Sequence, residues 1–115
     1  MTVSPGGFVA PDYRSRSIGD IVPAVARALG VLGSVLGGAP AGLVLPDAHS
    51  YVVFLVDGLG SELLRRHGYA APFLSALVDG QEAGTAGVPS TTATSLTSLG
   101  TGLPPGAHGL VGFTS

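Results

Sequence analysis

The sequence predicts an α/β fold in which helices cover a central, mostly parallel sheet. Residues 51–56 (Tyr-Val-Val-Phe-Leu-Val) form a continuous β-prone run without polar alternation, the pattern of a strand covered on both faces. The segments after it predict two helices, a weaker strand at residues 81–88 and another helix. This order of elements is typical of a layered α/β fold.

The first fifty residues predict an irregular arm, one helix and a linker. Residues 1–16 are rich in Pro, Gly and Ser, which favours irregular structure. Asp20 can cap the helix that follows, and glycines at 30–33 close it. Three apolar residues at helical spacing are predicted on its buried face, Ile21, Val25 and Leu29. Residues 37–50 are rich in Gly and Pro and predict a linker.

Three helices are predicted after the apolar run. The first runs from Glu62 through Arg66 to His67-Gly68, with Ser61 as its cap and cations in its last turn. A short helix is predicted at residues 71–78, and a third at residues 92–99, closed by glycines. Two leucines are predicted to face inward from the third helix, Leu96 and Leu99.

The composition fits a folded domain and excludes several functions. The chain has 115 residues, of which 45% are hydrophobic and 10% charged, so it is too apolar for a disordered chain. A net charge of -2 without a basic stripe gives no support for binding a nucleic-acid polymer. Cysteine and lysine are both absent, which removes thiolate metal sites, Walker A loops and Schiff-base chemistry.

Residues 28–46 carry no charge and approach the length of a membrane span. Their glycines and Pro40 make a poor helix, so we expect no membrane association and a cytoplasmic protein. Export stays an alternative, because Ala39-Pro40-Ala41 is similar to a signal-peptide cleavage site. The segment that precedes the apolar run, with Asp12 and Asp20, argues against it.

The predicted chemistry begins at Asp57, directly after the predicted strand at 51–56. A carboxylate at the carboxyl end of a buried strand lies where open α/β sheets bind ligands, and Gly58 and Gly60 permit close approach. Asp57 is therefore a candidate metal ligand, although it could instead cap the next helix. A haloacid-dehalogenase-type phosphatase would need a second aspartate two residues away, where Leu55 and Leu59 stand.

A cluster of hydroxyl residues follows Pro89, namely Ser90, Thr91, Thr92, Thr94 and Ser95. The N–H groups and the positive dipole end at a helix start favour an anion. A hydroxyl at this position can attack phosphorus when a divalent metal stabilises its alkoxide. Ordinary capping of the helix is the alternative use of these side chains.

These residues resemble the nucleotide pyrophosphatase/phosphodiesterase branch of the alkaline phosphatase superfamily. In that family Pro, Ser or Thr, any residue and Thr open the nucleophile helix, and Thr-Gly-Leu, Pro and His-Gly follow. The matching residues here, without a gap, are Pro89 to Thr92, Thr101-Gly102-Leu103, Pro105 and His108-Gly109. Residues 51–60 are similar to the family's first metal-binding strand. The resemblance implies a division into an N-terminal arm, helix and linker at 1–50 and the first part of a catalytic domain at 51–115.

The resemblance also implies a mechanism. The chain would be part of an alkaline-phosphatase-like fold, incomplete here, in a metal-dependent phosphodiesterase or phosphatase that acts on small phosphate esters. Asp57 and Thr92 would bind one of two divalent ions, zinc by resemblance, in the full-length protein. Thr92 would be the nucleophile that forms a phosphothreonine, and its N–H would stabilise a phosphate oxygen.

Departures from the family pattern limit what carries over. Ala93-Thr94-Ser95 stands where the family usually has Phe-Pro-Asn, so we expect a different rim of the substrate pocket. Phe113 stands where an asparagine is common, which leaves diester or monoester preference open. The family's remaining ligands lie beyond Ser115, so we expect an inactive fragment. The three histidines, His49, His67 and His108, are not expected to replace those ligands.

The alternative is a non-catalytic small α/β module or decayed remnant, in which Asp57 and Thr92 only cap helices. A serine-triad hydrolase is disfavoured because the chain has no Gly-x-Ser-x-Gly elbow. A sulfatase is disfavoured because no Cys or Ser is followed by Pro and Arg at that branch's motif spacing.

Overall fold

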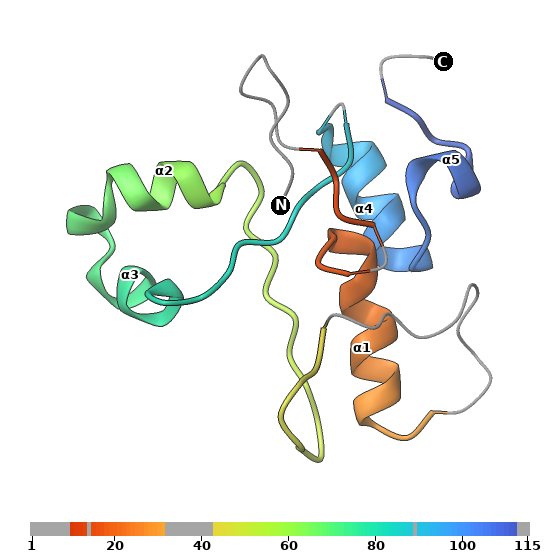
Figure 1. Ribbon diagram of the computed structural model, residues 1–115, viewed down its shortest axis with the longest axis horizontal. Coiled ribbons are helices and arrows are strands. Elements are labelled where there is room, and N and C mark those ends of the chain that lie inside the picture. Colours follow the sequence, from red (N-terminus) through yellow and green to blue (C-terminus); the bar gives the residue numbers. More distant parts are fainter. Residues whose placement is uncertain (1–9, 14, 32–42, 89, 113–115) are drawn as a thin grey trace. The chain divides into compact units, whose positions relative to one another are not determined.

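The computed structural model describes residues 10–13, 15–31, 43–88 and 90–112. The chain divides into two compact units, and each is described by itself: unit 1 is Met1–Val52 with Gly84–Ser115, and unit 2 is Val53–Ala83. The helices are η1 (Ile18–Asp20), α1 (Ile21–Ala28), α2 (Ser61–Arg66), η2 (Gly68–Ala70), α3 (Pro72–Val78), α4 (Thr92–Thr101) and α5 (Pro105–His108), and Figure 1 labels α1 to α5. None of the described helices has the length and apolar character needed to span a bilayer.

The predicted α/β layered fold with a central parallel sheet is wrong for the described residues, which form helices and no strand. Their only pairing of β type is an isolated parallel bridge between Ser17 and Thr85. In the run at 51–56, Val52 is 92% exposed and Phe54 is 84% exposed. A strand needs a neighbour for its hydrogen bonds, and a two-sided apolar strand needs a layer on each face. The apolar run at 51–56 predicts side chains covered on both faces, but no described segment covers Val52 or Phe54.

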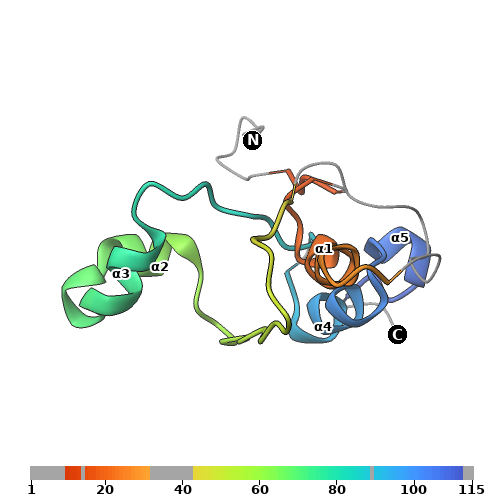
Figure 2. The same cartoon turned by 90° about the horizontal axis from the view of Figure 1, so that it is seen from below.

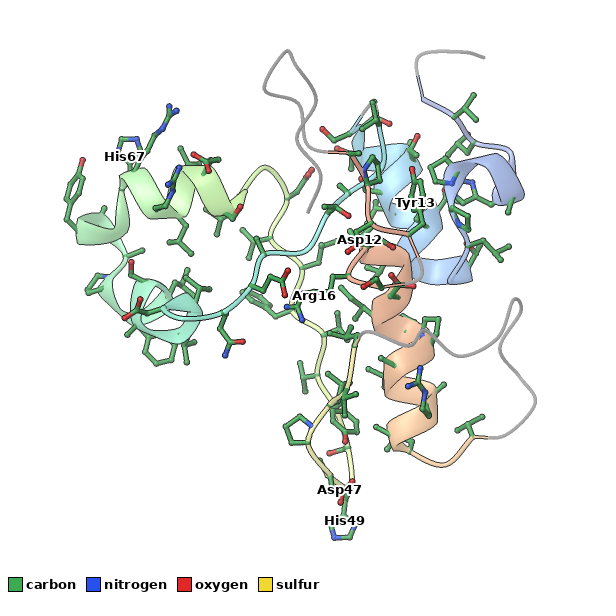
Figure 3. The ribbon with its side chains drawn as sticks, in the orientation of Figure 1. Asp12, Tyr13, Arg16, Asp47, His49 and His67 are labelled. Carbon is green, nitrogen blue, oxygen red and sulfur yellow. The ribbon has the colours of Figure 1, made fainter. Side chains whose placement is uncertain are left out.

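The predicted strand at 81–88 is also absent, and its residue Thr85 instead holds the N-terminal segment. The Asp12 N–H donates to Thr85 Oγ1 at 2.7 Å. The Thr85 N–H donates to the Arg16 carbonyl at 2.7 Å, and the Ile18 N–H donates to the Thr85 carbonyl at 2.8 Å. The main-chain and side-chain polar groups of Thr85 are therefore all paired with the segment that leads into α1, where Figure 3 labels Asp12 and Arg16.

A buried pair, Ser17 and Asp20, turns the chain into α1. The Ser17 N–H and the Ser17 hydroxyl both donate to Asp20 Oδ2 at 2.8 Å. Asp20 precedes α1, as predicted for its cap, but its carboxylate makes no capping hydrogen bond to that helix. Two hydrogen bonds to a buried carboxylate offset part of its desolvation, which explains why the side chain turns back to Ser17.

Helix α1 ends as predicted but buries a different face. The Gly30 N–H donates to the Arg27 carbonyl and the Val31 N–H to the Ala26 carbonyl, at 3.0 and 2.9 Å. With Gly30 at φ 73°, this is a Schellman ending. The predicted inward face is wrong at Leu29, which is 45% exposed. The buried residues are two small ones, Pro23 and Ala24.

The small buried face of α1 reflects a close approach to the end of α4. A Cβ placed at Gly102 would lie 2.8 Å from Pro23 Cγ. Gly102 also has φ 70°, a left-handed conformation that ends α4. Because the two segments come this close, small residues replace the leucine that helical spacing alone would place in the contact.

Unit 2 contains the two short helices that the sequence predicts. Helix α2 begins at Ser61, but its cap position is occupied by Gly60. Leu64 is its buried residue, and α3 starts with Pro72 in its first turn. Both predicted helices are thus present: α2 begins one residue earlier and ends at Arg66, before the predicted end at His67-Gly68, and α3 begins one residue later than predicted.

An exposed ion pair lies on α2. The Arg65 guanidinium donates a hydrogen bond to Glu62 and holds the pKa of that carboxyl below its ordinary value. A lowered folded-state pKa favours the helix above the ordinary carboxyl pKa, and this small contribution is lost as the pH falls through the folded value. Salt weakens the pair because both side chains are exposed.

Helix α4 is confirmed over the predicted range, but its buried face is polar. Thr94 is 0% exposed and Ser98 is 3% exposed, whereas the predicted inward residue Leu96 is 47% exposed. Helix α4 contacts η1, α1 and α5, and Figure 2 shows these elements side by side. A Cβ at Gly19, in η1, would lie 3.4 Å from the Ser98 carbonyl oxygen. Such a close approach to the neighbouring backbone favours small hydroxyl residues over leucine.

The close approach of residues 16 and 84 can be tested by adding one methyl group. In Gly84→Ala the new Cβ would lie 2.7 Å from the Arg16 carbonyl oxygen. We expect the free energy of unfolding to fall by about 1–3 kcal/mol. The control is Gly100→Ala, inside α4, where a new Cβ meets nothing within 4 Å. We expect a gain of about 0.5–1 kcal/mol there. Urea unfolding followed by circular dichroism measures both, and equal effects would contradict the contact.

Candidate functional site

The two predicted site residues lie in different units. Asp57 lies in unit 2, in the turn that follows the run at 51–56, and its side chain is exposed. Thr92 lies in unit 1 as the first residue of α4 and is also exposed. Because each unit is described by itself, the convergence of Asp57 and Thr92 on one cation stays a prediction.

Thr91, and not Thr92, caps α4. Thr91 has extended backbone angles, and its hydroxyl accepts from the Thr94 N–H at 3.4 Å. The same hydroxyl donates to Thr94 Oγ1 at 2.9 Å, and the Thr91 carbonyl accepts from the Ser95 N–H at 2.9 Å. Capping was the alternative reading of the whole hydroxyl cluster, and the structure gives this role to Thr91. The Thr92 side chain follows at the first helical position.

Asp57 does not occupy the cap position of the helix that follows it. Gly60 holds that position in α2, and no side chain makes a capping hydrogen bond there. Asp57 therefore does not act as the N-cap of α2. Its carboxylate has the oxygen donors that hard and borderline divalent cations accept.

A close contact of four segments lies just ahead of the hydroxyl cluster, at the buried residue Gly87. A Cβ placed there would lie 3.0 Å from Pro105 Cγ and 3.6 Å from both Thr94 Cγ2 and the Tyr13 hydroxyl. Tyr13, labelled in Figure 3, comes from the N-terminal segment that is predicted to be an irregular arm. No periodicity in the sequence indicates that Tyr13 packs at Gly87.

Two residues of the predicted family pattern, Pro89 and Phe113, lie outside the described residues.

His108 forms a hydrogen-bonded link between α4 and α5. The Leu110 N–H donates to His108 Nδ1 at 3.1 Å, so this nitrogen carries no proton. In the neutral ring the proton is then on Nε2, which lies 2.9 Å from Ser98 Oγ and donates to it. Both ring nitrogens are thus hydrogen-bonded within the fold, and that His108 is not a metal ligand stays a prediction.

The same geometry argues against a serine hydrolase. A Ser and a His at 2.9 Å resemble a nucleophile and its base. Here the His108 nitrogen that faces Ser98 already holds a proton, so it cannot take one from the serine. Ser98 is also buried, at 3% exposure, which closes it to a substrate.

The other two histidines are His67, in unit 2, and His49, in unit 1. His67 follows α2, with its Nδ1 3.4 Å from the Tyr69 hydroxyl. His49 lies beside Asp47 at the tip of the loop that precedes residue 51, as Figure 3 shows. Across the described ranges, no three His, Cys, Asp or Glu side chains gather into a group that could hold a metal ion. The described part of the chain thus contains isolated candidate metal ligands and no complete set of ligands for a metal ion.

A family model for type I phosphodiesterase / nucleotide pyrophosphatase matches residues 51–115, more than half of the chain. The chain belongs to this family. The match confirms the resemblance drawn from the motifs, and it contains both Asp57 and Thr92. Type I phosphodiesterases act on small phosphate esters and are generally metal-dependent. A search of curated proteins and a search of solved structures each gave no match.

The state of His108 in this phosphodiesterase-family chain can be measured. We expect a long-range ¹H–¹⁵N spectrum to place the ring proton on Nε2, and we expect diisopropyl fluorophosphate to leave Ser98 unmodified. His67 serves as the reference, because its ring is exposed. A proton on His108 Nδ1, or an adduct on Ser98, would contradict the assignment.

Proposed function

We propose that this chain supplies the nucleophile and two ligands of one metal ion in a metal-dependent phosphoryl-transfer hydrolase of the phosphodiesterase or nucleotide pyrophosphatase type. Thr92 is the proposed nucleophile, and Asp57 and Thr92 are the proposed ligands of one cation. One observation carries the proposal. Thr91 takes the capping role at α4, so the exposed Thr92 side chain stands at the helix start, inside the family match.

The proposed reaction has two displacements at phosphorus. The Thr92 hydroxyl loses its proton to solvent, and Oγ1 forms a bond to phosphorus in line with the ester oxygen, which leaves with its bonding electrons and takes up a proton. Water then attacks the phosphothreonine, releases the phosphate product and returns the threonine hydroxyl. The backbone N–H groups and the dipole at the start of α4 favour the phosphate oxygens. A divalent ion, when bound, stabilises the alkoxide form of Thr92 and the charge on the phosphoryl group.

The donor set fits a divalent cation in type but not in number. A carboxylate and an alkoxide are suitable oxygen ligands, and zinc commonly takes about four ligands in all. We propose two zinc ions in the complete protein, with the missing ligands supplied from outside these 115 residues. The chain by itself is then expected to turn over no phosphate ester.

Removing the Thr92 hydroxyl tests the nucleophile. In the complete metal-loaded protein, Thr92→Ala should lower kcat by about a thousandfold or more, because no other group can form the intermediate. The assay uses p-nitrophenyl phosphate and bis(p-nitrophenyl) phosphate. The matched control is Thr97→Ala in the same helix, whose hydroxyl donates to the Ala93 carbonyl at 2.8 Å and should be dispensable. Unchanged turnover in Thr92→Ala would defeat the proposal.

The number of ligands is tested by calorimetric titration of the 115-residue chain with zinc. We expect weak binding without a tight two-site stoichiometry, since two oxygen ligands are too few. Asp57→Asn should weaken what binding there is. Asp47→Asn is the control, because Asp47 is also an exposed aspartate. Tight binding of two zinc ions per chain would show that the ligand set is complete. This result would contradict the proposal that further ligands come from outside these 115 residues.

A further inference from the structure

The buried face of α4 carries a line of hydrogen-bonded hydroxyl groups. Thr91, Thr94 and Ser98 stand at spacings of three and four residues, so they share one face of the helix. The Thr91 hydroxyl donates to Thr94 Oγ1, and Ser98 Oγ accepts from His108 Nε2, both at 2.9 Å. We call these three residues and His108 the hydroxyl ladder. It begins one residue before Thr92 and ends on α5.

Such a face holds a helix differently from an apolar one. Hydrophobic contact has no preferred direction, whereas a hydrogen bond weakens when its distance or angle changes. Thr94 is 0% exposed, so a rotation of α4 that broke its hydroxyl contact would leave a buried polar group unsatisfied. The ladder therefore restricts the rotation of α4 about its own axis.

Neighbouring backbone packs against α4 at two levels of the ladder. Thr94 Cγ2 lies 3.6 Å from the position that a Cβ on the buried residue Gly87 would take. On the next turn, a Cβ on Gly19 would lie 3.4 Å from the Ser98 carbonyl oxygen. Ordinary packing contacts at these two levels accompany the directional hydrogen bonds.

The rotation of α4 sets the direction of the first helical side chain. Successive residues of an α-helix project about 100° apart, so fixing Thr91 and Thr94 also fixes where Thr92 points. We propose that the hydroxyl ladder positions the Thr92 hydroxyl for attack, with Thr94 as the positioning residue. This inference rests on the proposed function, since it takes Thr92 as the nucleophile. Positioning of this kind affects the chemical step more than substrate binding.

The test is Thr94→Val, which keeps the shape of the side chain and removes its hydroxyl. In the complete metal-loaded protein we expect kcat to fall about tenfold with KM within about twofold of the parent value. Thr94→Ser restores the hydroxyl and should recover most of kcat. Thr97→Val is the matched control, because its hydroxyl lies outside the ladder. A Thr94→Val enzyme that behaves like the Thr97→Val enzyme overturns the inference.

A second readout needs no activity. In the 115-residue chain, three-bond couplings of Thr92 should show one dominant χ1 rotamer, and Thr94→Val should average them. Amide exchange of Ser95, whose N–H donates to the Thr91 carbonyl, should quicken about tenfold in the same variant. If Thr94→Val does not fold, Ser98→Ala tests the other end of the ladder by the same measurements. Unchanged couplings and exchange in the folded variant overturn the inference.

The two proposals fail separately. If Thr92→Ala keeps its turnover, the nucleophile is wrong and the proposed function fails, whatever the couplings show. If Thr92→Ala is inactive and Thr94→Val keeps the parent kcat, the nucleophile stands and the ladder alone is wrong.

Discussion

The burial of Thr94 is the constraint on which the arrangement of unit 1 depends. Among the described residues, the buried polar side chains are Ser17, Asp20, Thr94 and Ser98, all in this unit. Each net hydrogen bond contributes about 1 kcal/mol, less than a fully buried aliphatic side chain. A unit held in this way gains modest stability but a well-defined geometry. Such geometry matters at the start of α4, where we propose the nucleophile.

Local signals predicted the helices well. The helices after the apolar run and the ending at Gly30 depend on proline, glycine and capping, whose effects act within one turn, although the cap of α2 is Gly60 and not the predicted Ser61. The prediction of a sheet was wrong because burial is not local. The apolar run at 51–56 indicates that its side chains favour burial, but the run itself does not identify the segment that would cover them. The inward position of Leu96 in α4 was wrong for the same reason, since the neighbouring backbone decides which face of the helix is buried.

The candidate nucleophile follows from a motif that fixes the register. The pattern after Pro89 predicts Thr92, and in the structure its neighbour Thr91 is the residue that caps α4. The contacts that hold α4 carried no such signal. Asp12 and Thr85 are 73 positions apart, and the bond from His108 to Ser98 joins two helices. Polar pairs of this kind have no period in the sequence, so only the fold reveals them.

The structure changes the interpretation of the departure from the family pattern at residues 93–95. From the sequence, Ala93-Thr94-Ser95 in place of Phe-Pro-Asn predicted a different pocket rim. Thr94 is fully buried, so it cannot line a rim, and its change acts on the interior side of α4. A proline there would have neither the N–H nor the hydroxyl that meet Thr91. Ala93 is exposed beside Thr92, so of these two positions only residue 93 could contribute to the proposed rim. The departure from the family pattern thus falls on one buried and one exposed position of the same helix turn.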